Sequence, residues 1–233
     1  MKKLNVMDLG LGNYTQVLRL QKEIMEKRAR GEVEDTLILV EHPTVITLGV
    51  KANEQSIKVT KEYLAENGIE VHEILRGGAA FLHSPGQIVG YPIFLLEANE
   101  RRAYLETIQQ MMMDLTEEHK IPAVLHPNKD YIGVWYEVES GAYKKIGAVG
   151  MRFVNRNDQY VTLHGFALNV NNDSSIVEKL IFMCGCPSET CISWKEITQK
   201  TFDLSQIKEN IIHKLAKDLH YNTVYTNKKN NHH

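Results

Sequence analysis

The apolar residues of this chain fall into short runs with two different periods, and this mixture restricts its fold more than any other feature. Between Asn13, a good helix cap, and Gly31, a good helix stop, apolar residues from Tyr14 to Ile24 recur at spacings of three and four and predict an amphipathic helix. Residues 36–40 are almost continuously apolar, as in a strand covered on both faces. Runs of both kinds alternate without a fixed repeat, so we expect an α/β (α+β) fold and neither a solenoid nor a propeller.

The same two patterns predict the remaining elements. Residues 44–48 look like a continuation of the strand at 36–40 after Pro43. Further helices are expected at residues 60–67, around 104–115 and at 204–219, and residues 174–182 form an amphipathic stretch. Further strands are expected at residues 69–74, 132–138, 144–154 and 160–170.

The length of 233 residues, with 43% hydrophobic, suits one sizeable core. We therefore expect residues 1–222 to form a single catalytic domain, followed by a polar tail at 223–233 that can be partly an expression tag. The longest apolar stretches fall far short of the roughly 20 residues that span a bilayer, which argues against a membrane protein.

Charge and cysteine content limit the partners and the compartment. The formal charge is −2, and lysines and arginines are spread among acids, so nucleic acid is not suggested as a partner. The three cysteines are an odd number and all lie within residues 184–191, unlike a disulfide framework. The N-terminal segment does not have the pattern of a secretory leader. We therefore expect a reducing, cytoplasmic location.

A glycine-rich segment at 76–87 is the first candidate for chemistry. Its paired glycines, Gly77 and Gly78, allow the backbone to approach a ligand closely, and His83 and a Pro-Gly turn follow. The spacing fits neither a P-loop nor a dinucleotide fingerprint, so ATP and NAD lose support. A tight connection between strands with a surface histidine remains the alternative interpretation.

A second candidate is the strand that begins with Lys144 and Lys145. Neighbouring side chains of a strand point to opposite faces, so at most one of these lysines can face a site. A lysine that marks an exposed sheet edge is the alternative. Gly147 and Gly150 weaken a strand interior unless something must come close to the backbone, which favours a site.

The third candidate is Cys184, in a turn-forming Cys-Gly-Cys-Pro stretch after the amphipathic segment. Three interpretations stay open from the residues alone. The cysteine can be buried and inert, it can bind zinc with Cys186 and Cys191, although a fourth ligand at the usual spacing is missing, or it can be a nucleophile.

Taken in order, these segments resemble the lipoate-pathway octanoyltransferases, the enzymes that move octanoate from acyl carrier protein to a lysine of lipoyl domains. The similarity runs from about residue 8 to residue 194. It rests on residues 40–49 (VEHPTVITLG), 76–87 (RGGAAFLHSPGQ) and 163–171 (LHGFALNVN), on Lys145 in a KIxxxG strand, and on Cys184 before a glycine. The resemblance implies a biotin/lipoate protein ligase-like fold with a mixed β-sheet flanked by helices.

The resemblance also implies a mechanism. Cys184 would carry the octanoyl group as a thioester acyl-enzyme, Lys145 would be the second catalytic residue, and His164 would support them. No cofactor is implied. The donor would be octanoyl-acyl carrier protein, and the acceptors would be lipoyl domains of 2-oxoacid dehydrogenases or the glycine cleavage H protein. The residues implied to bind the substrate are Arg76, Gly77, Gly78, Ala79, Ala80, Phe81, Leu82, His83, Ala148, Val149, Gly150, Gly165, Phe166 and Ala167.

Several positions depart from the family pattern. Met183 replaces the usual proline, Phe81-Leu82 replaces Thr-Tyr, and Ser84 replaces a glycine that could take a positive φ. Three alternatives therefore remain: an ATP-dependent lipoate or octanoate ligase, which has no need of Cys184; an amidotransferase that moves octanoyl between lipoyl proteins; and a degenerate acyl-binding module that binds without turnover.

Overall fold

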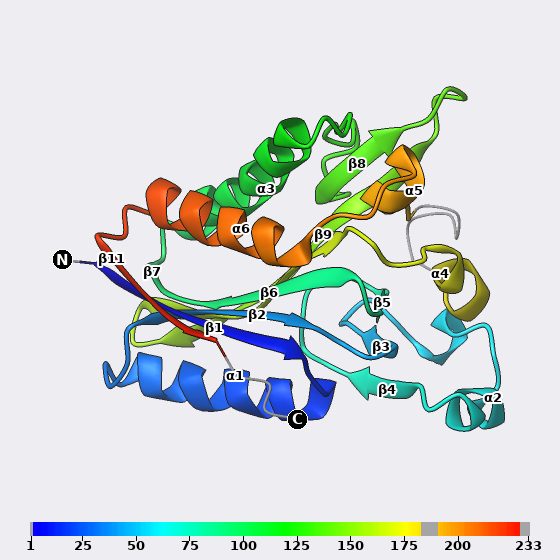
Figure 1. Ribbon diagram of the computed structural model, residues 1–233. Helices are drawn as coiled ribbons and strands as arrows, with labels where there is room; N and C mark the ends of the chain where they lie inside the picture. The colour runs from blue at the N-terminus through cyan, green and yellow to red at the C-terminus, as the bar shows by residue number, and fades with distance from the viewer. Residues whose placement is uncertain (1, 183–190, 229–233) are drawn as a thin grey trace.

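The computed structural model describes residues 2–182 and 191–228, and its core is one large mixed sheet (Figure 1). The strands run in the order β11-β1-β2-β6-β10-β9-β8, with β7 paired to β10. Their bounds are β1 Lys3–Leu11, β2 Asp35–Glu41, β6 Gln87–Ile93, β7 Leu95–Glu97, β8 Gly133–Glu137, β9 Tyr143–Arg156, β10 Gln159–Asn169 and β11 Thr223–Lys228. A smaller sheet has the order β4-β3-β5, with β3 Val45–Leu48, β4 Glu70–Glu73 and β5 Ala80–His83.

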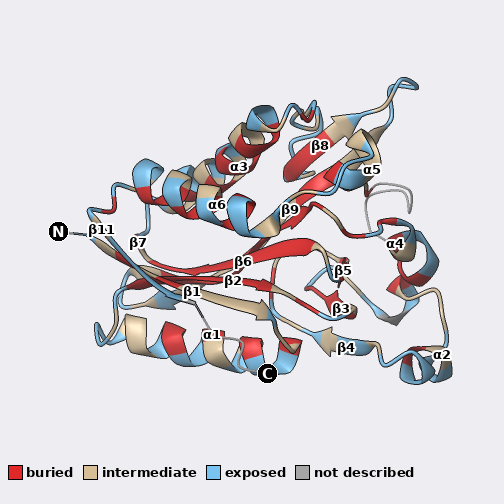
Figure 2. Cartoon of the chain, in the orientation of Figure 1, coloured by how far each residue is buried: buried red, intermediate tan, exposed pale blue. Residues whose placement is uncertain are grey.

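Helices cover both faces of the large sheet (Figures 1 and 2). Helix α1, Tyr14–Ala29, packs its apolar stripe on one face with side chains of β2, β6 and β10. Helices α3, Arg101–Glu118, and α6, Leu204–Asp218, pack together on the other face. Strands β2 and β6 are therefore buried almost throughout, as the continuous apolar run in β2 predicts.

Short helices complete the fold around the smaller sheet and the cavity described below. They are α2 Lys61–Glu66, α4 Ser175–Leu180, α5 Trp194–Thr198 and the 3₁₀ turn η1 Glu54–Ser56. Leu64 of α2 and Leu180 of α4 share a hydrophobic cluster with Ile46 and Leu82 of the small sheet. This cluster holds the small sheet against the rest of the chain.

The prediction that residues 44–48 continue the strand at 36–40 is wrong. Strand β2 pairs with β1 and β6 in the large sheet, whereas β3 pairs with β4 and β5 in the small one. Pro43 lies between them, two residues after β2 ends at Glu41, and it has no backbone N–H to donate to a neighbouring strand. The chain leaves the large sheet at this point.

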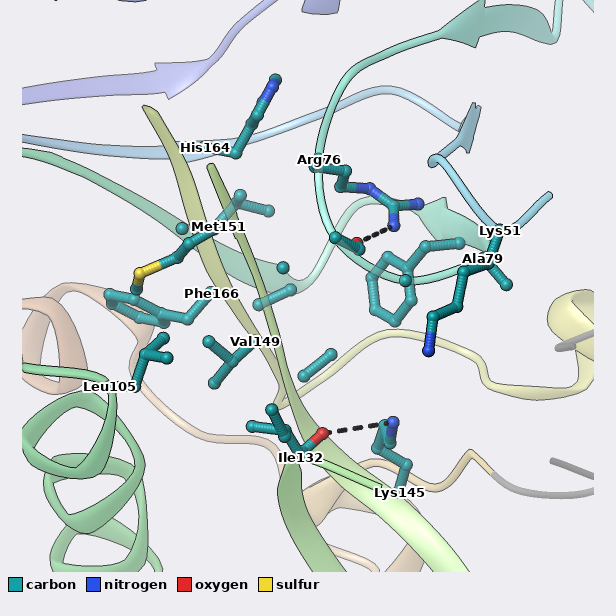
Figure 3. Close-up of a pocket in the computed structure, with 18 of the residues that line it drawn as sticks. Lys51, Arg76, Ala79, Leu105, Ile132, Lys145, Val149, Met151, His164 and Phe166 are labelled. Atoms are coloured by element: carbon teal, nitrogen blue, oxygen red, sulfur yellow. Dashed lines mark hydrogen bonds between the residues drawn. The ribbon is translucent and has the colours of Figure 1, made fainter. Parts of the chain in front are cut away.

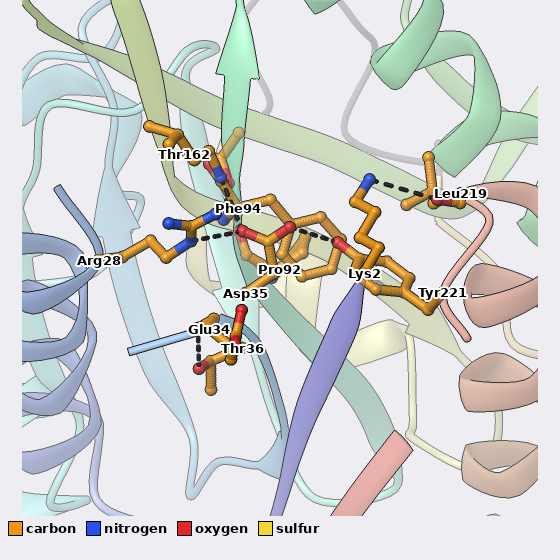
Figure 4. A network of polar contacts seen from close by, with 11 residues as sticks. Lys2, Arg28, Glu34, Asp35, Thr36, Pro92, Phe94, Thr162, Leu219 and Tyr221 are labelled. Carbon is orange, nitrogen blue, oxygen red and sulfur yellow. Dashed lines mark hydrogen bonds and ion pairs between the residues drawn. The ribbon is translucent and has the colours of Figure 1, made fainter. Parts of the chain in front are cut away.

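The segment at 223–233, expected to be a polar tail, contributes a strand. Strand β11 runs parallel to β1, with Thr223 opposite Lys3. Just before it, the Tyr221 hydroxyl donates a 2.7 Å hydrogen bond to the buried Asp35 carboxylate, which also accepts from the Arg28 side chain at 2.7 Å (Figure 4). Burial, and then the Asp35 charge, raise the pKa of Tyr221 well above its ordinary value, so the hydroxyl remains a donor. These contacts fix the C-terminal segment to the sheet.

In the described part of the chain, no helix combines the length and the apolar character needed to cross a membrane.

Candidate active site

A cavity of about 680 Å³ lies between the large and small sheets (Figure 3). Its walls come from the glycine-rich loop before β5, from the middle of β9 and β10, from α3 and from the loop before β8. The residues implied by the family resemblance that line it are Arg76, Gly77, Gly78, Ala79, Ala80, Phe81, His83, Lys145, Ala148, Val149, Gly150, His164, Gly165, Phe166 and Ala167. Segments distant along the sequence therefore meet at one site, while the roles of these residues stay predictions.

Two predicted residues are not placed at the cavity. Leu82 alternates with the lining residues Phe81 and His83 along β5, and its side chain is buried in the hydrophobic cluster of the small sheet. Cys184 lies outside the described residues, as does Cys186. Cys191 is buried at 6% exposure, and it forms a parallel bridge with Lys145.

The glycine-rich loop is held in place by its own backbone. The Gly49 N–H donates to the Ala79 carbonyl at 3.2 Å, the Lys51 N–H donates to Gly78 at 3.0 Å, and the Gly77 N–H donates to Met151 of β9 at 3.2 Å. Gly78 has a φ of +87°, and a Cβ at Gly49 would overlap its carbonyl oxygen. Close approach of two backbones explains why both positions are glycine.

The Arg76 guanidinium is buried beside the cavity, where it donates to carbonyl and hydroxyl oxygens. Its Nη2 lies 2.9 Å from the Thr47 carbonyl and 2.8 Å from the Thr47 hydroxyl, and its Nη1 lies 2.9 Å from the Gly77 carbonyl. Burial lowers the pKa of Arg76 to about 10, so the side chain still carries its charge at neutral pH. A positive charge is therefore fixed at the cavity wall.

Two buried histidines, His42 and His83, lie in ring contact with each other beside the cavity in their neutral forms. His83 Nδ1 donates to Gln87 Oε1 at 2.7 Å, since an amide oxygen can only accept. His42 Nδ1 donates to the Gly12 carbonyl at 2.7 Å, so its Nε2 accepts from the Tyr91 hydroxyl at 2.9 Å. Burial lowers the pKa of His83 to about 3 and that of His42 to about 4. His83 is thus no surface histidine, contrary to the alternative drawn from the sequence.

His164 is held in an unusual backbone conformation in the middle of β10. Its φ is +61°, a value that costs a residue other than glycine about 1–3 kcal/mol. Its N–H donates to Gln21 Oε1 of α1 at 3.2 Å, and its buried Nδ1 has no hydrogen-bond partner among the described residues. Burial, followed by the charge of Arg76, lowers its pKa to about 4. The supporting role of His164 stays a prediction.

Lys145 lies on an inner strand, not at a sheet edge. Strand β9 pairs with β10 on one side and β8 on the other, so the edge-lysine alternative does not apply. The Lys145 Nζ lies 3.5 Å from the Ile132 carbonyl and 4.4 Å from the centre of the Trp135 ring, a cation–π contact. Lys144 does not line the cavity, as the alternation of the strand predicts.

The substitution of Ser84 for glycine introduces no positive φ. Within the described residues, the positive φ of this turn, +87°, falls on Gly86 instead. The Gly86 N–H donates to Glu41 Oε2 at 3.0 Å, and its carbonyl accepts from the Asn171 N–H at 2.9 Å. The turn after His83 is therefore anchored to β2 and to the end of β10 without strain at Ser84.

Sequence patterns missed several walls of the cavity. Tyr14 and Tyr91 close one side, while Leu105 of α3 and Phe153 of β9 close another, and Lys51 and Ile132 lie at the mouth. Nothing local to these residues distinguishes them from ordinary core or loop positions. Only the pairing of distant elements brings them to the cavity.

Comparison with known proteins identifies the family of this chain. Residues 13–216 match the lipoyl protein ligase A/B catalytic domain. The chain belongs to this family. It is 36% identical over 225 residues to an octanoyltransferase of Alkaliphilus metalliredigens, covering 96% of this chain and 98% of the relative. It is 35% identical over 204 residues to an octanoyltransferase of Rubrobacter xylanophilus, covering 87% of each. Within the family it groups with the octanoyltransferases.

Solved structures confirm the expected fold of this octanoyltransferase-like chain. A lipoate-protein ligase A bound with ATP superposes with a TM-score of 0.72 at 13% identity, over 99% of this chain and 90% of the other. A bipartite lipoate protein ligase from Thermoplasma acidophilum superposes with a TM-score of 0.71 at 13% identity, over 99% and 89%. At this identity the likeness concerns the fold alone.

Proposed function

We propose that the chain transfers an octanoyl group from octanoyl-acyl carrier protein to a lysine of a lipoyl domain, through a thioester on Cys184. The acceptor domains would belong to 2-oxoacid dehydrogenases or the glycine cleavage H protein, in lipoate biosynthesis. The observation that carries the proposal is the Lys145 amine, which lines the same cavity as the glycine-rich loop and the apolar middle of β9 and β10. The octanoyltransferase relatives support the same conclusion.

The length of the cavity wall suits a medium-chain acyl group. A strand advances about 3.4 Å per residue, so the Cα atoms of Lys145 and Val149 are about 14 Å apart along β9. An extended chain advances about 1.2 Å per bond, so the seven carbon–carbon bonds of octanoyl span about 8 Å. An acyl group with its carbonyl near Lys145 would therefore end before Val149, which pairs with Phe166 across the strands, so this wall is long enough for an octanoyl group.

The proposed chemistry has two transfer steps. The Cys184 thiolate attacks the donor thioester, the bond between the acyl carbon and the carrier sulfur breaks, and the carrier leaves as a thiolate that takes up a proton. The neutral amine of the acceptor lysine then attacks the octanoyl-enzyme, an amide forms, and the Cys184 thiolate is released. Lys145 would relay the proton that the acceptor amine loses. A thioester is already activated, so the forward reaction needs no nucleotide.

Lys145 would also help to ionise Cys184. A free thiol has a pKa near 8.5 and is only slightly ionised at neutral pH. A unit positive charge about 4 Å away is worth about 4 kcal/mol at an effective dielectric near 20, which limits the pKa decrease to about three units. Such a thiolate also needs a reducing compartment, so the proposal includes the cytoplasm.

The test is transfer itself. Octanoyl-acyl carrier protein and an apo lipoyl domain are mixed with the enzyme without ATP, and octanoylation of the domain is followed by mass spectrometry. We expect turnover without ATP, and a loss of about 100-fold or more in Lys145→Met. Lys144→Met, on the opposite face of the same strand, is the matched control and should retain activity. Octanoylation that requires ATP and free octanoate would instead indicate a ligase.

A further inference from the structure

Apolar side chains from separate loops are exposed at or next to residues that line the cavity. Val50 and Leu75 are 62% and 60% exposed, and each directly adjoins a cavity-lining residue, Lys51 and Arg76 respectively. The Val50 N–H donates to the Arg76 carbonyl at 3.1 Å, so the two segments are tied together. Ile132, in the loop before β8, also lines the cavity and is 43% exposed. We call Val50, Leu75 and Ile132 the apolar rim.

Positive charge accompanies this rim. Lys51 is exposed, and Figure 3 shows its side chain and that of Lys145 directed into the same part of the cavity. Asp130 is the one carboxylate among the described residues that line the cavity. Exposed apolar side chains beside the opening of a site are typical of protein contact surfaces. The charges favour a partner that brings acidic side chains to the mouth.

The reach of each partner decides which of them needs this rim. A lysine side chain has five bonds from Cα to Nζ and spans about 6 Å when extended. An acceptor domain must therefore place its backbone almost at the mouth for its amine to reach a thioester beside Lys145. A carrier protein presents its acyl group on a long prosthetic arm, so its folded body can stay away from the rim.

We propose that the apolar rim is the docking site of the acceptor domain and not of the carrier protein. This inference rests on the proposed function and names the surface that its second step uses. Docking at the rim would bury Val50 and Leu75 and place acidic side chains of the acceptor near Lys51.

The test separates the two partners kinetically. Val50→Asp and Leu75→Asp place a negative charge on the rim without altering a residue that lines the cavity. The matched control is Val224→Asp, a 37% exposed valine on β11 at the opposite edge of the large sheet from β8. For each variant we would measure KM for the acceptor domain, KM for octanoyl-acyl carrier protein, and acyl-enzyme formation from octanoyl-pantetheine, a small donor that needs no docking.

We expect each rim variant to raise KM for the acceptor about tenfold, the effect of losing one well-packed interface residue. KM for the carrier and the reaction with octanoyl-pantetheine should stay at the wild-type values, as should all three measurements for Val224→Asp. An unchanged KM for the acceptor, a rise for the carrier alone, or equal rises for both partners would overturn the assignment. Failure of the proposed function would differ, because the wild-type enzyme would then transfer no octanoyl group.

Discussion

Lowering the pH from 7 to 5.5 should destabilise this fold by about 4 kcal/mol, through the three histidines buried around the cavity. His42, His83 and His164 are each less than 10% exposed. Burial lowers the pKa of His83 to about 3 and the pKa values of His42 and His164 to about 4. All three are therefore neutral in the native state throughout this pH range.

The direction of this stability change follows from the unfolded chain, in which a histidine has a pKa near 6.5. Above that pH both states are neutral and the histidines leave stability unchanged. As the pH falls below 6.5, the unfolded state takes up protons that the native state cannot, so the free energy of unfolding decreases until the folded pKa values are reached. Each histidine contributes about 1.3 kcal/mol between pH 7 and 5.5, and three contribute about 4 kcal/mol.

Urea unfolding at several pH values between 7 and 5.5 measures this loss of stability. The ordinary pKa values of Asp and Glu lie below this pH range. Replacing one histidine, as in His42→Gln, should reduce the loss to about 2.5 kcal/mol whatever the variant does to stability at pH 7. His213→Gln, on an exposed position of α6, controls for the substitution itself. A free energy of unfolding that stays constant between pH 7 and 5.5 would refute the reasoning.

Two further predictions concern stability. Tyr221→Phe removes a hydrogen bond to a buried carboxylate and should lower the free energy of unfolding, measured in urea, by about 1.5–3 kcal/mol. The control Tyr225→Phe, at a 51% exposed position on β11, should lower it by less than about 0.5 kcal/mol. Equal effects of the two variants would contradict the role of the buried network. Gly165→Ala would push a methyl group into a backbone carbonyl of β6, and it should lower the free energy of unfolding by about 3 kcal/mol or prevent folding. At Gly77 the nearest atom to an added Cβ is 3.5 Å away, so Gly77→Ala should be tolerated. Wild-type stability of Gly165→Ala would show that β6 and β10 are less closely packed than described.

The long helices could be predicted from sequence because their signals are local. Asn13 caps α1 by accepting a hydrogen bond from the Gln16 N–H, as its side chain predicts. The apolar spacings of α3 and α6 likewise mark the faces that pack on each other.

The arrangement of strands could not be predicted in the same way. Strand β11 forms because the free edge of β1 offers backbone partners to residues 223–228. Residues 223–226, Thr-Val-Tyr-Thr, are of types that favour strands, but they do not indicate which edge they pair with. Similarly, β3 and β2 have similar apolar patterns, and only their partners show that they belong to different sheets. Strand pairing depends on contacts between distant segments, which composition and period do not encode.

The candidate site was predicted in part. The glycine-rich loop and Lys145 stood out through residue types that an ordinary strand or turn does not need, and they do meet at one cavity. Leu105, Tyr14 and Phe153 gave no such signal, because a cavity wall uses the same apolar residues as a core.

The central claim is that the octanoyl group passes through a thioester on Cys184. Intact-mass measurement of the enzyme after incubation with octanoyl-acyl carrier protein, without an acceptor, tests it directly. We predict one added octanoyl mass that hydroxylamine removes and that Cys184→Ala does not acquire. An octanoyl mass on Cys184→Ala, or one that resists hydroxylamine, would contradict the mechanism.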